Sequence, residues 1–120
     1  MPTSVAVVAS DARVRERLAA LIPNDSFSIS LHAPDDIPQE MPNLFIIALP
    51  ALETPEEQLI ERLRADEATA NIPIVIASAL PMVHLQSVPY AADWTIAVVE
   101  EPVKAAELAD TIRFLLHPDA

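Results

Sequence analysis

Acidic residues are the most numerous class of side chain in this 120-residue chain that could take part in chemistry. Four of them stand at or just after the end of an apolar run: Asp11, Glu53, Glu100 and Glu101. If these runs are parallel strands, their carboxyl ends share one edge of a sheet and the four carboxylates converge there. A divalent-cation site is one interpretation. We favour the other, a helix cap with solvated loop acids, and predict no metal.

The other residue types narrow the chemistry further. None of the three histidines, His32, His84 and His117, has a second histidine four residues away, which favours surface or edge positions over metal binding. Without cysteine, the chain has no disulfide, thiolate site or Cys nucleophile. Without glycine, it has no phosphate-cradling loop and no glycine-flanked nucleophile elbow. We therefore expect no cofactor and no enzymatic activity.

Three further side chains each allow two interpretations. Ser78 ends an apolar run, where its hydroxyl is either a remnant of a functional site or a strand-end group that caps a loop; we favour the second. Tyr90 and Trp94 lie in PYAADWT, before the last apolar run. They either anchor a protein interface or pack a short helix on the sheet.

The charge of the chain limits its partners. Seven Lys and Arg against 18 Asp and Glu give a formal net charge of −11. This charge disfavours nucleic-acid backbones and anionic membrane surfaces, because both are bound through Lys and Arg. We find neither a signal-peptide pattern nor an apolar run of about 18 residues, the length that a membrane span needs, and we expect a cytoplasmic protein.

Five segments have the pattern of β-strands. Residues 4–9, 43–50 and 72–80 are apolar runs, typical of strands buried on both faces. Residues 26–33 alternate between apolar and polar types, typical of a half-exposed strand at an edge. TIAVVE, residues 95–100, is the last strand.

Helical segments separate these strands. Asp11 caps a helix over 12–22, and Thr54 caps another, with Pro55 at its first position. A last helix starts at 103, and residues 82–88 form a short one. Three prolines within 34–42 limit any helix there to about a turn.

The alternation of strands and helices predicts one α/β domain. It is a doubly wound, five-stranded parallel sheet of flavodoxin-like order 2-1-3-4-5 with a shortened second helix. We assign residues 1–117 to this domain and 118–120 to a frayed end or the start of a linker.

Four stretches, in order along the chain, resemble the receiver domain of bacterial two-component response regulators. LIERLRADEATANIPIVIASAL, residues 59–80, is similar to the third helix, loop and fourth strand of that family. VAVVASDARVRERLAAL, NLFIIALP and EEPVKAAELADTIRFLL resemble the first strand and helix, the third strand, and the end of the fifth strand with the last helix. The resemblance implies Mg²⁺-dependent phosphorylation of an aspartate at the end of the third strand.

Most of the residues that this chemistry requires are missing. Alignment with the family puts Ala48 at the phosphoacceptor, Ala9 and Ser10 at the acidic pair, and Glu101 at the lysine. The switch aromatic falls at Val98, and only the hydroxyl, Ser78, matches. An alanine is no nucleophile, and a glutamate repels a phosphoryl group. We therefore interpret the chain as a pseudo-receiver, which cannot be phosphorylated.

The resulting hypothesis is a protein-interaction module in bacterial signalling or transcriptional control. It would pair with a second copy, or dock on another protein or domain, through the fourth helix, fifth strand and last helix, where the family commonly pairs. The residues expected at this interface are Val83, Leu85, Val88, Tyr90, Trp94, Val98, Lys104, Glu107 and Arg113.

Two alternatives remain open. One is a small-ligand sensor or enzyme that uses the flavodoxin-like crevice. The other is an ordinary phosphorylatable receiver with Asp35, Asp36 or Asp66 as its acceptor, although none of these lies at a predicted strand end.

Overall fold

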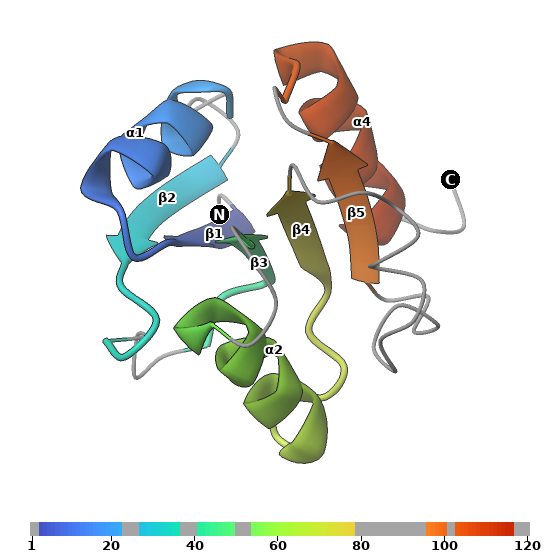
Figure 1. Cartoon of the computed structure of the whole chain (residues 1–120). Coiled ribbons are helices and arrows are strands. Elements are labelled where there is room, and N and C mark those ends of the chain that lie inside the picture. The colour runs from blue at the N-terminus through green and yellow to red at the C-terminus, as the bar shows by residue number, and fades with distance from the viewer. Residues whose placement is uncertain are drawn as a thin grey trace.

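The chain folds around one parallel β-sheet. The computed structural model describes residues 3–22, 27–36, 41–49, 54–78, 96–100 and 103–116. Its elements are β1 (Thr3–Val8), α1 (Ala12–Ala20), β2 (Phe27–His32), β3 (Leu44–Ala48), α2 (Pro55–Ala65), β4 (Ile74–Ser78), β5 (Ile96–Glu100) and α4 (Ala105–Leu116). The strands lie in the order β2-β1-β3-β4-β5, all parallel (Figure 1). This confirms the predicted flavodoxin-like sheet.

Helices cover both faces of the sheet. On one face, α1 and α4 bury Leu18, Leu108 and Ile112 against alternate residues of the strands. On the other, α2 buries Leu59 and Ile60 (Figure 1). Two apolar cores therefore lie back to back across the sheet.

The burial of each strand matches its pattern of apolar and polar residues. Every residue of β3 and of β4 is buried, and the four residues Val5–Val8 of β1 are fully buried. Among the described strands, β2 pairs only with β1, and the serines of β2 are exposed. A strand with a polar face is stable at an edge because no second strand and no complete helical layer must cover it.

Both predicted helix caps are present. The Asp11 carboxylate accepts a hydrogen bond from the Arg13 amide at 2.8 Å. The Thr54 hydroxyl accepts one from the Glu57 amide at 3.4 Å, and Pro55 is the first residue of α2. These contacts satisfy amides that no helical carbonyl can reach.

Some predictions fall outside the described residues. The short helix at 82–88 and the chain end at 118–120 are among them, and so are residues 37–40 of the expected short second helix. The described residues 33–36 form a turn, in which the Asp36 amide donates to the Ala33 carbonyl at 3.0 Å. Among the helices that the structure describes, none combines the length and apolarity needed to cross a membrane.

Candidate functional site

The carboxyl ends of β1, β3, β4 and β5 lie at one edge of the sheet, where parallel α/β proteins hold their functional groups. Two alanines occupy the ends of the central strands there. Ala9, after β1, is 2% exposed, and Ala48, the last residue of β3, is 6% exposed. Each side chain is one methyl group, so neither position offers a nucleophile or a metal ligand.

A serine and a buried glutamate meet beside these alanines. The Ser10 hydroxyl, after β1, donates a hydrogen bond of 2.9 Å to Oε1 of Glu56 in the first turn of α2. Glu56 is only 2% exposed. The helix dipole favours a negative charge in this turn. A carboxylate is thus fixed at the edge, next to the position that the resemblance assigns to the acidic pair.

Sequence reasoning missed Glu56. Acidic residues are common in the first turn of a helix, and most of them are solvated. The partners Ser10 and Glu56 are 46 residues apart, and no periodicity connects them. The one available signal was the Thr54-Pro55 start, which fixes where the first turn begins.

Ser78 has a structural partner at the same edge. Its buried hydroxyl donates to the Leu49 carbonyl at 2.8 Å, and the Leu49 amide donates to the Ala77 carbonyl, also at 2.8 Å. Together these bonds hold the first residue after β3 against the end of β4. A strand-end hydroxyl that caps a loop, the interpretation favoured for Ser78, requires such a contact.

A shallow open hollow of about 270 Å³ adjoins the Ser10–Glu56 pair. It is lined by Ser10, Ala33, Pro34, Asp35 and Pro55. This lining carries one hydroxyl and one carboxylate and is otherwise apolar. Phosphate recognition needs Lys, Arg or a cradle of amides, and the lining contains no Lys or Arg among the described residues.

The four acids considered for a cation site do not form one in the described residues. Asp11 caps α1, Glu100 is exposed at the end of β5, and Glu53 and Glu101 lie outside the described residues. Within the part of the chain that is described, no three His, Asp or Glu side chains are grouped as metal ligands would be.

His32 is held in a local hydrogen-bond network at the end of β2. Its ring nitrogens contact the Ser30 hydroxyl at 2.9 Å and the Asp36 carbonyl at 3.1 Å. This is the edge position expected from the sequence. His84 and His117 lie outside the described residues.

The predicted interface is described only in part. Val83, Leu85, Val88, Tyr90 and Trp94 lie outside the described residues. Val98 of β5 is half-buried against the core on the α2 side. Glu107 and Arg113 of α4 are exposed, and so is Lys104, the residue before this helix.

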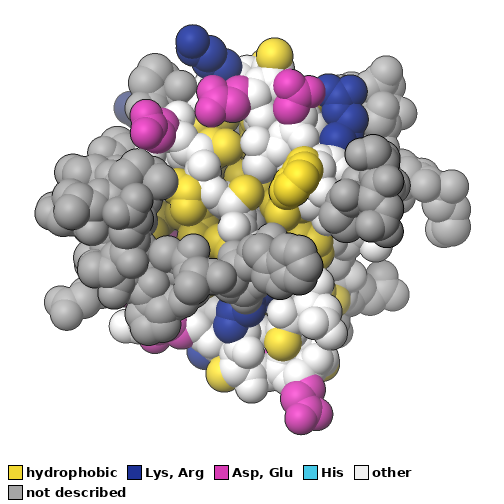
Figure 2. Space-filling view, turned by 90° about the vertical axis from the view of Figure 1, so that its right-hand side faces the viewer, with side chains coloured by type: hydrophobic (Ala, Val, Ile, Leu, Met, Phe, Trp, Pro, Cys, Tyr) yellow, Lys and Arg dark blue, Asp and Glu magenta, His cyan; other side chains and the backbone are white. Residues whose placement is uncertain are grey.

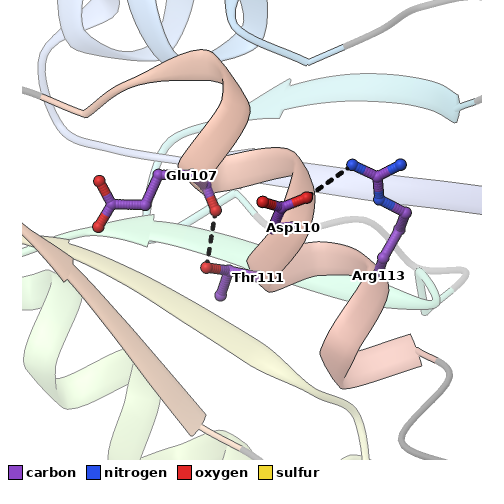
Figure 3. Close-up of polar contacts among 4 residues, drawn as sticks. All are labelled: Glu107, Asp110, Thr111 and Arg113. Atoms are coloured by element: carbon purple, nitrogen blue, oxygen red, sulfur yellow. Dashed lines mark hydrogen bonds and ion pairs between the residues drawn. The ribbon is translucent and has the colours of Figure 1, made fainter. Parts of the chain in front are cut away.

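Polar contacts on α4 are local to the helix (Figure 3). Arg113 pairs with Asp110 at 2.8 Å, and the Thr111 hydroxyl donates to the Glu107 carbonyl at 2.9 Å. Both members of the ion pair are largely exposed, so the pair contributes little to stability. Its charges can therefore be exchanged for those of a partner at low cost.

One interface candidate was missed. Phe114 of α4 is 65% exposed, the most exposed large hydrophobic side chain in the described residues. The face that carries α4 shows hydrophobic side chains beneath a row of acidic ones (Figure 2). The signal in the sequence was an aromatic residue placed off the buried stripe of the helix, two positions after Ile112.

Comparison with solved structures identifies the fold. A signal receiver domain of a signal transduction histidine kinase from Syntrophus aciditrophicus superposes with a TM-score of 0.79, at 18% identity over 98% of this chain and 92% of that one. A sensor protein from Polaromonas sp. JS666 gives 0.80 at 16% identity, covering 98% of both chains.

A response regulator receiver domain protein (CheY-like) from Methanospirillum hungatei JF-1 gives 0.77 at 14% identity, over 98% of this chain and 96% of that one. No protein-family model and no curated protein matches the sequence. The fold is therefore that of the receiver domains of signal-transduction proteins.

Proposed function

We propose that this chain is a receiver-like protein-interaction module that works without phosphorylation, in the cytoplasm, in bacterial signal transduction or transcriptional control. One observation carries the proposal. The methyl group of Ala48, the residue that the resemblance puts at the phosphoacceptor, ends β3 at the carboxyl edge of a sheet with the receiver fold. Phosphoryl transfer to a receiver needs a nucleophile at this position.

The surroundings of Ala48 also support the proposal. Phosphoryl transfer depends on positioning and on cations that neutralise the transferred group. Ala9 and Ser10 replace the acidic pair that would hold Mg²⁺, and Glu56 adds a buried carboxylate bonded to Ser10. A fixed negative charge without a metal repels a phosphate donor.

Incubation with acetyl phosphate and Mg²⁺ tests the proposal. We expect intact-mass spectrometry to show no gain of about 80 Da, the mass of one phosphoryl group. Ala48→Asp should also stay unmodified, because the metal ligands and the lysine are still missing. A phosphorylatable receiver domain treated in parallel is the positive control. A stoichiometric adduct on the unaltered chain would contradict the proposal.

The β5–α4 face, formed by residues 96–100 and 103–116, is the proposed docking surface. It combines the exposed Phe114 with the acidic Glu100, Glu107 and Asp110. An apolar anchor within a charged rim is typical of protein interfaces. The charges favour a partner with exposed Arg or Lys, whether another protein or Lys104 and Arg113 of a second copy.

A docking residue should contribute to binding and little to folding. Phe114→Glu is therefore expected to change the free energy of unfolding by less than about 0.5 kcal/mol, because Phe114 is mostly exposed. Leu108→Ala on the same helix, fully buried, should cost about 2–5 kcal/mol. Urea unfolding measures both. A loss above about 1 kcal/mol for Phe114→Glu would make Phe114 part of the fold and contradict its docking role.

A further inference from the structure

The outer edge of β2 presents backbone groups that have no partner among the described residues. The His32 carbonyl accepts a hydrogen bond from the Ala9 amide at 3.2 Å, so the backbone of His32 faces β1. Backbone direction alternates along a strand. The amides and carbonyls of Phe27, Ile29 and Leu31 therefore point away from β1, and no hydrogen bond to them exists in the structure as described.

Within the described residues, this edge also lacks the usual protection against strand addition. Natural edge strands are guarded by Lys, Pro, a bulge or a covering segment. β2 has the sequence FSISLH, with no charge and no proline, and its pairing with β1 runs through six consecutive residues without a bulge. Leu31 is 45% exposed on this strand. In a chain of net charge −11, an uncharged edge that exposes a leucine is suited to pairing with another strand.

We propose that a second copy of this chain adds its β2 antiparallel to this edge, about a two-fold axis at Ile29. The outward-facing residues then form hydrogen-bonded pairs, in which both amides and both carbonyls are exchanged. Phe27 pairs with the second copy's Leu31, Ile29 with its own equivalent, and Leu31 with the second copy's Phe27. Each of these outward-facing backbone groups gains a partner in this register.

Side chains fit the same register. On the face covered by α1, Leu31 lies opposite the second copy's Phe27, and aromatic–aliphatic cross-strand pairs are stabilising. On the other face, Ser28 lies opposite the second copy's Ser30. No charged residue opposes another across the paired strands. A second copy therefore both pairs the backbone groups of this edge and covers the exposed Leu31.

This arrangement leaves the β5–α4 face free. β2 and β5 are at opposite edges of the sheet. The dimer would be one continuous sheet with a docking face at each end, so it could bind two partner molecules or both halves of a symmetric one.

Sedimentation of the chain from about 1 µM to about 0.5 mM tests the inference, and we expect a reversible dimer. Leu31→Pro removes an amide N–H that points away from β1, so every hydrogen bond to β1 is kept. This variant should raise the dimer dissociation constant at least about tenfold. Leu31→Val keeps the amide and should retain the dimer. Circular dichroism checks that each variant folds. If Leu31→Pro does not fold, Leu31→Lys places a charge at the same exposed site and should weaken the dimer similarly.

A disulfide tests the register. The chain has no cysteine, so introduced thiols are unambiguous. Oxidation of a mixture of Ser28→Cys and Ser30→Cys should give a mixed cross-linked dimer, and each variant alone should give much less.

Two results would overturn the inference. One is a monomer at every concentration, which leaves docking on another protein intact. The other is a dimer that Phe114→Glu abolishes and Leu31→Pro does not, which would assign self-association to the β5–α4 face.

Discussion

Ser10→Asp should lower the free energy of unfolding by about 2–3 kcal/mol, although it introduces an acidic residue of the kind that phosphorylatable receivers carry there. The Ser10 hydroxyl donates to Oε1 of Glu56 at 2.9 Å, and Glu56 is 2% exposed. The aspartate carboxylate cannot donate this hydrogen bond, and it carries the same negative charge as the Glu56 carboxylate. The buried carboxylate then loses its hydrogen bond and gains a repulsive neighbour.

Two controls separate these effects in urea unfolding. Ser10→Asn has nearly the shape of aspartate and can donate from its amide, so we expect a loss below about 1 kcal/mol. Ser10→Ala removes the donor without adding charge and should fall between the two. Equal stability of the Asp and Asn variants would contradict the proposed repulsion.

The double variant Ser10→Asp with Glu56→Gln completes a mutant cycle. The neutral amide that this second substitution introduces can donate to the new carboxylate. We therefore expect the double variant to recover most of the loss, with a coupling energy of about 1–2 kcal/mol. Little recovery would show that the aspartate is unfavourable for a reason other than Glu56.

Much of the fold was predictable because the pattern of apolar and polar residues in each strand indicates where that strand lies in the sheet. Residues 44–48 are apolar throughout and lie in the centre of the sheet, whereas 27–32 alternate and lie at its edge. Likewise, the caps at Asp11 and Thr54 depend on residues no more than three positions away. Patterns among neighbouring residues therefore suffice to predict the placement of these strands and the two helix caps.

Of the candidate site, only the features that follow from the residue type at a given strand end were predictable. Ala48 was found through its position at the end of an apolar strand. The Ser10–Glu56 contact joins two helix starts, and the burial of Glu56 is set by how α2 packs, which no local pattern encodes. Phe114 was missed although it lies off the buried stripe of α4, because such a position does not by itself indicate a contact surface. The whole interface stays a prediction, and its part at residues 79–95 lies outside the described residues.

Arg64→Met is expected to lower the free energy of unfolding by about 2–4 kcal/mol. Arg64, near the end of α2, donates to three carbonyls of the segment that leads into β4. They belong to Ala70 at 2.9 Å, Thr69 at 3.3 Å and Ile72 at 2.8 Å. Methionine keeps the apolar part of the side chain and removes the donors, so these carbonyls lose a charged partner.

The same helix offers a matched control. Arg62 is exposed two residues earlier, and Arg62→Met should change the free energy of unfolding by less than about 0.5 kcal/mol. Arg64→Lys keeps the charge but cannot span three carbonyls, so it should recover only part of the loss. Native-state hydrogen exchange at Ala70 and Ile72 should rise in Arg64→Met alone. Equal losses at positions 62 and 64 would mean that charge near the helix end, and not the hydrogen bonds to this segment, stabilises the start of β4.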